Sequence, residues 1–274
     1  MNFDLSTWPE VNLQQVRASF KEVPLSAYPE LSAYNRDGIH ELQMGQGGLF
    51  LASDMAKLLK LKPGMRVLDL ACGAGTTSIF LAKHFGVSVY AMDENLPDSL
   101  IERAAAAGVS DLITTTKADA RKLPFAQEFF DAVFCMNAFF YFATDDLYPP
   151  YLMRLLKMGG ELVIGSPCYR TEIPAVIPEE FLLEFPACLA VHSPGWWRHH
   201  FEQTRDAEVL HSELHPRGVE FWDDRVRYLL EAQSPTKMEP WMRDMIYAMI
   251  RMRNRDTDGF VSHFMLHARR QRRT

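Results

Sequence analysis

Two aspartates and a pair of glycines follow short apolar segments at intervals that suit a small ligand. Asp69 lies near the end of the apolar run 65–70, and Gly73 and Gly75 follow it before a helix-like segment. A turn of such small residues lets the backbone approach a ligand closely. Asp93 lies 18 residues beyond Gly75, near the interval at which an acidic side chain binds both hydroxyls of a ribose. The spacing therefore predicts a ligand that carries a ribose.

The residues of the turn argue against a dinucleotide as that ligand. A dinucleotide fingerprint requires a third glycine at position 78, where this chain has Ser78, and a turn that accepts a pyrophosphate. Asp69 would repel that anion, but it would attract a ligand with an ammonium or sulfonium charge. S-adenosylmethionine is such a ligand. The alternative is that Asp69 only caps the helix that follows.

Two further polar residues follow later apolar segments. Asp119 comes after the third segment and could accept a hydrogen bond from an adenine amino group, and Asn137 comes after the fourth. Parallel sheets bind ligands at the carboxyl ends of their strands, so we expect both residues at one edge with Asp69 and Asp93. Asp93 and Asp119 could instead be solvated strand-end carboxylates.

Alternating strands and helices are predicted to position these residues. The apolar segments are short and rich in branched residues, and they lie at 65–70, 87–92, 112–117, 131–136 and 160–164. Helix-like stretches separate them, at 77–85, 97–107 and 147–157. This alternation implies right-handed βαβ units and a parallel sheet covered on both faces. The predicted class is therefore α/β.

The order of the motifs resembles the class I S-adenosylmethionine-dependent methyltransferases, and among them the small-molecule and quinone-type branch. The resemblance covers about residues 60–166 and rests on Asp-Leu-Ala-Cys-Gly-Ala-Gly at 69–75, the acidic residue 93, Ala-Asp-Ala at 118–120, Leu-Pro-Phe at 123–125, Phe-Asp at 130–131 and Leu-Lys-Met-Gly-Gly at 156–160. It implies a Rossmann-like sheet of seven strands, mostly parallel with the last strand antiparallel.

The resemblance also implies a cofactor site. The cofactor would be S-adenosyl-L-methionine, bound by Asp69, Ala71, Gly73, Gly75, Asp93, Asp119, Ala120 and Asn137. Ala71 replaces the glycine that is usual at its position, which we expect to be a mild change because a methyl group is small.

The chain outside the resemblance is expected to complete the domain. Residues 1–60 are predicted to form a helical N-terminal extension or cap, and residues 61–274 the methyltransferase domain. A sixth strand is expected at 207–214 and a seventh at 260–267. The aromatic and Met-rich block 219–255 between them is predicted to be an inserted helical lid over the acceptor, or alternatively an oligomer surface of a homodimer.

Methyl transfer from a sulfonium is an in-line displacement, so a general base is needed only if the acceptor loses a proton on the way to the transition state. Candidate catalytic residues are His199, His200 and Tyr141. An exposed helical turn is the alternative for the two histidines. The segment after the fourth strand, Asn-Ala-Phe-Phe at 137–140, lacks the two prolines of enzymes that methylate adenine or cytosine amines.

Composition limits the partners. The 274 residues carry 29 Lys and Arg against 35 Asp and Glu, a net charge of −6, which disfavours nucleic acid. No cysteine pattern indicates a metal site. With no membrane span expected, the chain is predicted to be cytoplasmic. The predicted function is methyl transfer to a small-molecule acceptor; the alternatives are a non-catalytic S-adenosylmethionine-binding regulatory module or, with less support, an RNA methyltransferase.

Overall fold

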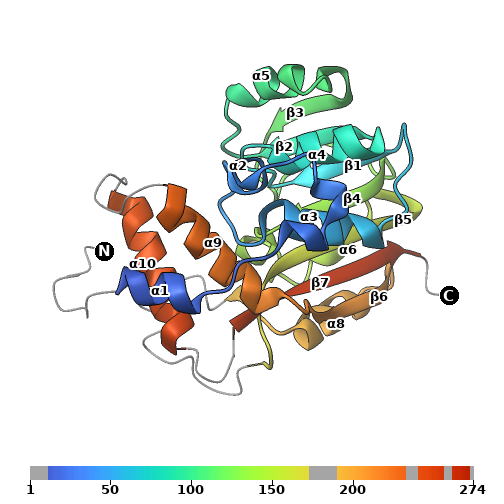
Figure 1. Cartoon of the computed structure of the whole chain (residues 1–274). Coiled ribbons are helices and arrows are strands. Elements are labelled where there is room, and N and C mark those ends of the chain that lie inside the picture. Colours follow the sequence, from blue (N-terminus) through green and yellow to red (C-terminus); the bar gives the residue numbers. More distant parts are fainter. Residues whose placement is uncertain (1–11, 173–189, 233–239, 256–260, 272–274) are drawn as a thin grey trace.

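A single mixed sheet of seven strands forms the centre of the protein (Figure 1). The computed structural model describes residues 12–172, 190–232, 240–255 and 261–271. The strand order is β3-β2-β1-β4-β5-β7-β6. The strands are β1 (Arg66–Leu70), β2 (Ser88–Asp93), β3 (Ile113–Lys117), β4 (Phe130–Met136), β5 (Leu156–Tyr169), β6 (Ala207–Leu214) and β7 (Val261–Arg270).

Strand direction confirms the predicted fold class. The pairs among β1 to β5 are all parallel, whereas β7 is antiparallel to both of its neighbours, β5 and β6. Strand order reverses beside β1, since β2 and β4 flank it on opposite sides. Ligands of such sheets bind at the carboxyl ends of the strands near this reversal, which is where the predicted cofactor residues lie.

Alternation along each strand places apolar side chains on both faces of the sheet. Val67 packs in the core cluster that contains residues of α3 (Gly48–Leu58), α4 (Thr76–Phe85) and α5 (Ser99–Ala106). Leu68 packs in a second cluster with residues of α6 (Tyr148–Met153) and α8 (Pro194–Glu202). The sheet is therefore covered by helices on both faces, as the sequence predicts.

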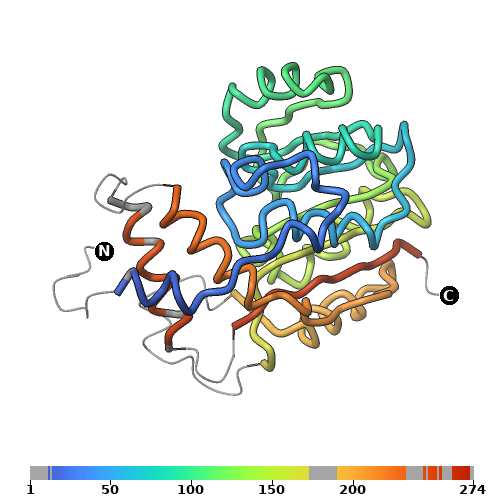
Figure 2. The backbone as a smooth tube through the Cα atoms, in the orientation of Figure 1, coloured from blue at the N-terminus to red at the C-terminus, as the bar shows by residue number. Residues whose placement is uncertain are grey.

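Two helical segments from distant parts of the sequence lie side by side next to the sheet (Figures 1 and 2). The N-terminal segment contains α1 (Leu13–Ser19), the short helices η2 (Leu25–Ala27) and η3 (Pro29–Leu31), and α2 (Arg36–His40). The other is the insertion between β6 and β7, with α9 (Gly218–Ala232) and α10 (Pro240–Arg255). Arg17 of α1 donates a hydrogen bond to the carbonyl of Leu230 in α9, at 2.9 Å.

The predicted boundary between the helix at 147–157 and the fifth strand differs from the structure. The helix expected at 147–157 ends at Met153, and β5 begins at Leu156 and not near residue 160. Leu156 already pairs with Phe130, and the register then shifts before Glu161 pairs with Ala132. Gly159 has a φ of 78° in this irregular stretch, a conformation that glycine adopts without strain. Short helices η4 (Ser110–Leu112) and η5 (Phe139–Tyr141) complete the described elements.

Candidate active site

The turn between β1 and α4 leaves the sheet through residues with positive φ. Gly75 has a φ of 77°, and an added Cβ would lie 2.4 Å from a methyl carbon of Leu100. Gly73 also has a positive φ, of 56°, but no atom lies within 4 Å of the place of its Cβ. Gly75 is therefore required by packing inside the protein, whereas Gly73 faces open space that a ligand could fill.

Ala71 is a larger departure from glycine than its size suggests. Its φ is 57°, in the left-handed region, where a non-glycine residue costs about 1–2 kcal/mol. The expectation of a mild change considered only the volume of the methyl group. The backbone angle, which the sequence does not show, makes the substitution costly.

Asp69 is buried below the turn, with 1% of its surface exposed. Its Oδ2 accepts hydrogen bonds from the hydroxyls of Thr77 and Ser78, both at 2.6 Å. Burial raises the pKa of Asp69 to about 6, although these two hydrogen bonds lower it. Gly75, not Asp69, occupies the N-cap position of α4, so Asp69 contacts side chains of the first helical turn and not its free N–H groups.

Asp93, at the end of β2, is held by backbone groups. Its Oδ2 accepts from the N–H of Gly73 and its Oδ1 from the N–H of Asn95, both at 2.8 Å. Asp119 follows β3, and its Oδ1 accepts from the N–H of Arg121 at 2.8 Å. Each carboxylate is thus fixed in position by the turn that carries it, with further acceptor capacity left for a ligand.

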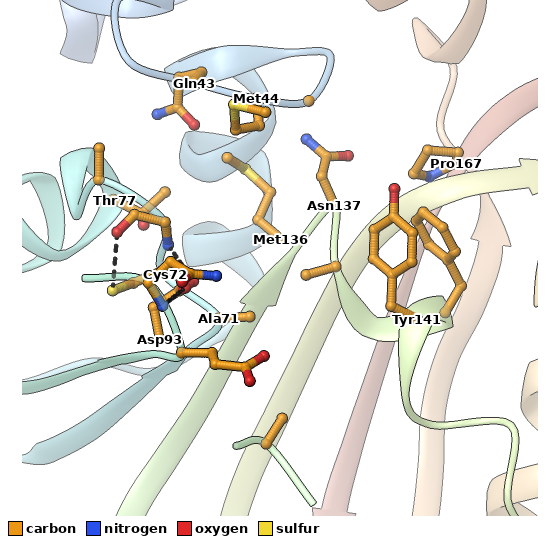
Figure 3. A pocket seen from close by; sticks show the side chains of 18 of the residues that line it. Gln43, Met44, Ala71, Cys72, Thr77, Asp93, Met136, Asn137, Tyr141 and Pro167 are labelled. Atoms are coloured by element: carbon orange, nitrogen blue, oxygen red, sulfur yellow. Dashed lines mark hydrogen bonds between the residues drawn. The ribbon is translucent and has the colours of Figure 1, made fainter. Parts of the chain in front are cut away.

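These residues surround one cavity of about 770 Å³, a size typical of small-ligand pockets. Figure 3 shows Cys72 and Asp93 on one side of the cavity, with Asn137 and Tyr141 on the other. Of the predicted cofactor residues, all except Gly75 line it: Asp69, Ala71, Gly73, Asp93, Asp119, Ala120 and Asn137. The structure therefore brings them to one edge of the sheet.

Comparison with known proteins agrees with this geometry. Residues 67–160 match the model of the family described as methyltransferase domain. Methyltransferase GfsG of Streptomyces halstedii is 26% identical over 125 residues, which make up 45% of each chain. The chain thus matches less than half the length of this relative.

Residues 67–160 belong to the class I S-adenosylmethionine-dependent methyltransferase family.

Two solved structures share the fold of this chain, and each matches a longer part of it than residues 67–160. Phosphoethanolamine N-methyltransferase 2 of Haemonchus contortus, in complex with S-adenosyl-L-methionine, has a TM-score of 0.70 at 18% identity and covers 92% of this chain and 60% of its own. The [4+2]-cyclase SpnF has a TM-score of 0.64 at 19% identity, and the match covers 80% of this chain and 79% of SpnF. At such identities the likeness shows the fold alone.

The chemistry of the residues that line the cavity fits S-adenosylmethionine, the cofactor of this family. Asp93 and Asp119 line the cavity and are acceptors of the kind that ribose hydroxyls and an adenine amine need, and the open space beside Gly73 leaves room for close approach of a ligand. Asp69 places negative charge at the same edge, which suits a ligand with ammonium and sulfonium charges.

We expect cofactor affinity to fall as the pH drops through about 6. Because burial raises the pKa of Asp69 to about 6, the side chain is negative above this pH and neutral below it, where its attraction for a cationic ligand is lost. Calorimetric titration with S-adenosylmethionine between pH 5 and pH 8 measures this. The variant Asp69→Asn should bind more weakly and without this pH dependence; an unchanged pH profile in it would contradict the role of Asp69.

The structure separates the three predicted catalytic residues. Tyr141 lines the cavity, and burial raises the pKa of its phenol above the ordinary value, so it is neutral near pH 7. His199 and His200 lie on α8, away from the lining residues. His199 is exposed, and Nε2 of His200 lies 2.9 Å from the carbonyl of Ala143.

The position of α8 explains why its histidines do not reach the cavity. Its residues Trp197 and Phe201 are buried in the core, and the helix packs against β6 and β7. Because the apolar side of α8 packs onto the sheet, both histidines lie outside the described wall of the site.

One part of the site was not predicted from the sequence, namely the loop between α2 and α3, which contributes residues 42–46. The block 219–255, which was predicted as a lid or an oligomer surface, also reaches the cavity. Its α10 residues Asp244, Ala248 and Arg251 line the cavity and lie at i, i+4 and i+7, the spacing of one helix face. The only sequence signal for the loop was its cluster of glycines, which indicated a turn and not a ligand contact.

The described residues contain neither a candidate metal site nor a candidate membrane-spanning helix. Within the described ranges, no group of three His, Cys, Asp or Glu side chains could hold a metal ion, and none of the helices there is long and apolar enough to span a bilayer. Cys72, Cys135 and Cys168 are free thiols. Burial raises their pKa values, which makes them poor nucleophiles. Cys188 lies outside the described residues.

Proposed function

We propose that this protein transfers a methyl group from S-adenosylmethionine to a small-molecule acceptor. The observation that carries the proposal is one cavity with two kinds of wall. Carboxylates and a glycine turn suited to the cofactor line one part of the cavity, and aromatic residues in and directly after η5 line another, namely Phe140, Tyr141 and Phe142. The family supports the cofactor, and the aromatic wall supports an acceptor with apolar character.

When bound, S-adenosylmethionine supplies an activated methyl group, so the main task of the protein is to align donor and acceptor and to exclude water. Asp93 and Asp119 hold the adenosine part, and Asp69 balances positive charge near the turn. Tyr141 is a neutral phenol that can hydrogen-bond to an acceptor without removing its proton. No histidine is among the described residues that line the cavity, which favours an acceptor that needs no histidine base.

A binding module without methyl transfer is the second candidate. The fold does not decide between the two candidates, because the [4+2]-cyclase SpnF shares it. The two candidates share the cofactor site and differ in whether methyl leaves the cofactor.

Two measurements, made one after the other, test the proposed function. Calorimetry should show low-micromolar binding of S-adenosylmethionine or S-adenosylhomocysteine and none of NAD; equally tight NAD binding would contradict the cofactor assignment. Incubation with methyl-labelled S-adenosylmethionine and a small-molecule extract should then yield a labelled product by mass spectrometry. Binding with no labelled product would favour the binding module.

The insertion containing α9 and α10 is proposed to act as a lid over the acceptor. Trp222 of α9 is 6% exposed and lines the cavity, together with the α10 residues. The side chain of Trp241 lies outside the described residues. The alternative, a dimer surface, stays a prediction that ultracentrifugation would test.

We expect Trp222→Ala to weaken acceptor turnover while cofactor affinity stays within about threefold, or about 0.7 kcal/mol. The residues proposed to bind the cofactor lie on other elements, whereas the indole of Trp222 forms part of the cavity wall proposed to face the acceptor. Steady-state kinetics with the labelled product, and calorimetry with S-adenosylhomocysteine, measure the two effects. Because Trp222 also packs in the core, the melting temperature must be recorded. Loss of a dimer with unchanged turnover would contradict the lid.

A further inference from the structure

One wall of the cavity comes from the N-terminal part of the chain. Residues 42–46, called here the pocket loop, join α2 to α3, and all five line the cavity. Figure 3 shows Gln43 and Met44 of this loop across the cavity from Asp93. Leu42 and Met44 are 49% and 68% exposed, so the loop has little apolar burial of its own to hold it in place.

Two side chains from distant elements bind the backbone of this region. Nδ2 of Asn137 donates to the carbonyl of Gln46 at 2.8 Å. The guanidinium of Arg225, on α9, donates to the carbonyl of His40 at 2.8 Å and also to that of Gln43. The pocket loop is therefore fastened at both ends by hydrogen bonds to its main chain.

Asn137 is itself held in a conformation that few residues tolerate. Its φ is 58°, and its backbone N–H donates to the carbonyl of Gly165 at 2.7 Å. Asparagine adopts the left-handed region more readily than most other residues. Strained residues of this kind persist where the surrounding structure fixes them and are frequent at functional sites.

The contact between Asn137 and the loop is close. An added Cβ on Gly45 would lie 2.4 Å from Nδ2 of Asn137 and 2.5 Å from its Cβ. Gly45 has no positive φ, so the requirement for glycine here is steric and not conformational. The loop can lie on Asn137 only because residue 45 has no side chain.

The closed loop leaves several buried polar atoms without partners. Oδ1 of Asn137, Nε2 of Gln43 and Nε1 of Trp222 have no hydrogen-bond partner within the described part of the protein. All three residues line the cavity. Unpaired buried polar groups are costly, so this closed arrangement is easier to open than a fully paired one.

We propose that Asn137 is a positioning residue that holds the pocket loop closed over the bound cofactor, so that the Asn137–Gln46 contact must break each time S-adenosylhomocysteine leaves. The inference rests on the proposed function, since it takes S-adenosylmethionine as the ligand of the cavity. The loop would exclude water during the reaction and would set the rate of ligand exchange.

Dissociation of S-adenosylhomocysteine, followed by stopped-flow tryptophan fluorescence, tests the proposal. Asn137→Asp keeps the side-chain shape but removes the donor, and Asn137→Gly suits the left-handed backbone without a side chain. Each should raise the dissociation rate constant about fivefold or more, with a smaller effect on the association rate constant. Gly45→Ala should do the same, because its methyl group pushes the loop away from Asn137.

The double variant Gly45→Ala/Asn137→Gly distinguishes a specific contact from general damage. Removing the Asn137 side chain gives the new methyl group room, so the double variant should dissociate no faster than Asn137→Gly alone. Matched controls are Asn254→Asp, on the exposed surface of α10, and Gly195→Ala, where an added Cβ meets no atom closer than 3.9 Å. Both controls should match the wild type.

Hydrogen exchange of the ligand-free protein gives an independent measure. The amides of residues 42–47 should exchange about fivefold or more faster in Asn137→Asp than in the wild type. Unchanged dissociation rates and unchanged exchange in the Asn137 variants would overturn the proposal. If the wild type does not bind S-adenosylhomocysteine, the proposed function fails, whereas exchange still decides whether Asn137 holds the loop.

Discussion

Replacing Asp224 with alanine is expected to lower the free energy of unfolding by about 3–5 kcal/mol. This carboxylate is fully buried on α9, and its Oδ1 accepts from Arg36 at 2.7 Å and from the N–H of Val23 at 2.8 Å. Nε2 of His40 lies 2.9 Å from Oδ2. Although burial favours the neutral acid, pairing with His40 and Arg36 keeps the pKa of Asp224 below its ordinary value.

The loss of stability is large because the groups that pair with Asp224 remain in place without their acceptor. Without Asp224, the guanidinium of Arg36 and the backbone N–H of Val23 lose their acceptor, and the N-terminal segment loses these two polar contacts with α9. Urea unfolding followed by circular dichroism measures the change. Asp111→Ala, at an exposed position, is the control and should change stability by about 0.5 kcal/mol or less. A loss below about 1 kcal/mol in Asp224→Ala would contradict this role.

Asp93→Ala is expected to cost roughly 1.5–3 kcal/mol of cofactor affinity, a loss of about 10- to 150-fold. The carboxylate is placed to accept from two hydroxyls of the ligand, and its position is fixed by the N–H groups of Gly73 and Asn95. The fold should persist, because β2 pairs with β1 and β3 through its backbone.

Calorimetry with S-adenosylhomocysteine measures this loss, and circular dichroism checks the fold. Asp93→Asn removes the charge but keeps the shape and should lie between Asp93→Ala and the wild type. Asp111→Ala again serves as the control. Wild-type affinity in Asp93→Ala would exclude the ribose role.

The parts of the site that the sequence predicts correctly are those that depend on local order along the chain. Asp69, Asp93 and Asp119 each lie at or just beyond the carboxyl end of a strand. Parallel strands bring these ends to one edge, so sequence position alone places the three residues together. The same logic predicts the first five strands, whereas the antiparallel direction of the seventh was implied only by the resemblance to the methyltransferase family. Pro149 and Pro150 lie in the first turn of α6, where proline is favoured, so the start of this helix can also be predicted from the sequence.

The parts that were missed depend on tertiary packing. The pocket loop reaches the cavity because Arg225 and Asn137 bind it, and neither residue is near it in sequence. His200 was expected near the acceptor, but burial of Trp197 and Phe201 sets the orientation of its helix. Such outcomes are decided by which apolar face finds a partner in the core, and a pattern along the chain does not contain that information.

The place of β7 has a consequence for how the protein forms during synthesis. β7 is the last of the seven strands in the sequence, yet it lies between β5 and β6 and pairs with both, through the registers Gly165–Met265 and Ser212–Leu266. While residues 261–270 are still inside the ribosome, β6 has no neighbour in the final order and β5 has an open edge. The nascent chain must therefore keep this edge from pairing with other chains, and a stop codon that removes β7 would leave two strands unable to join one sheet.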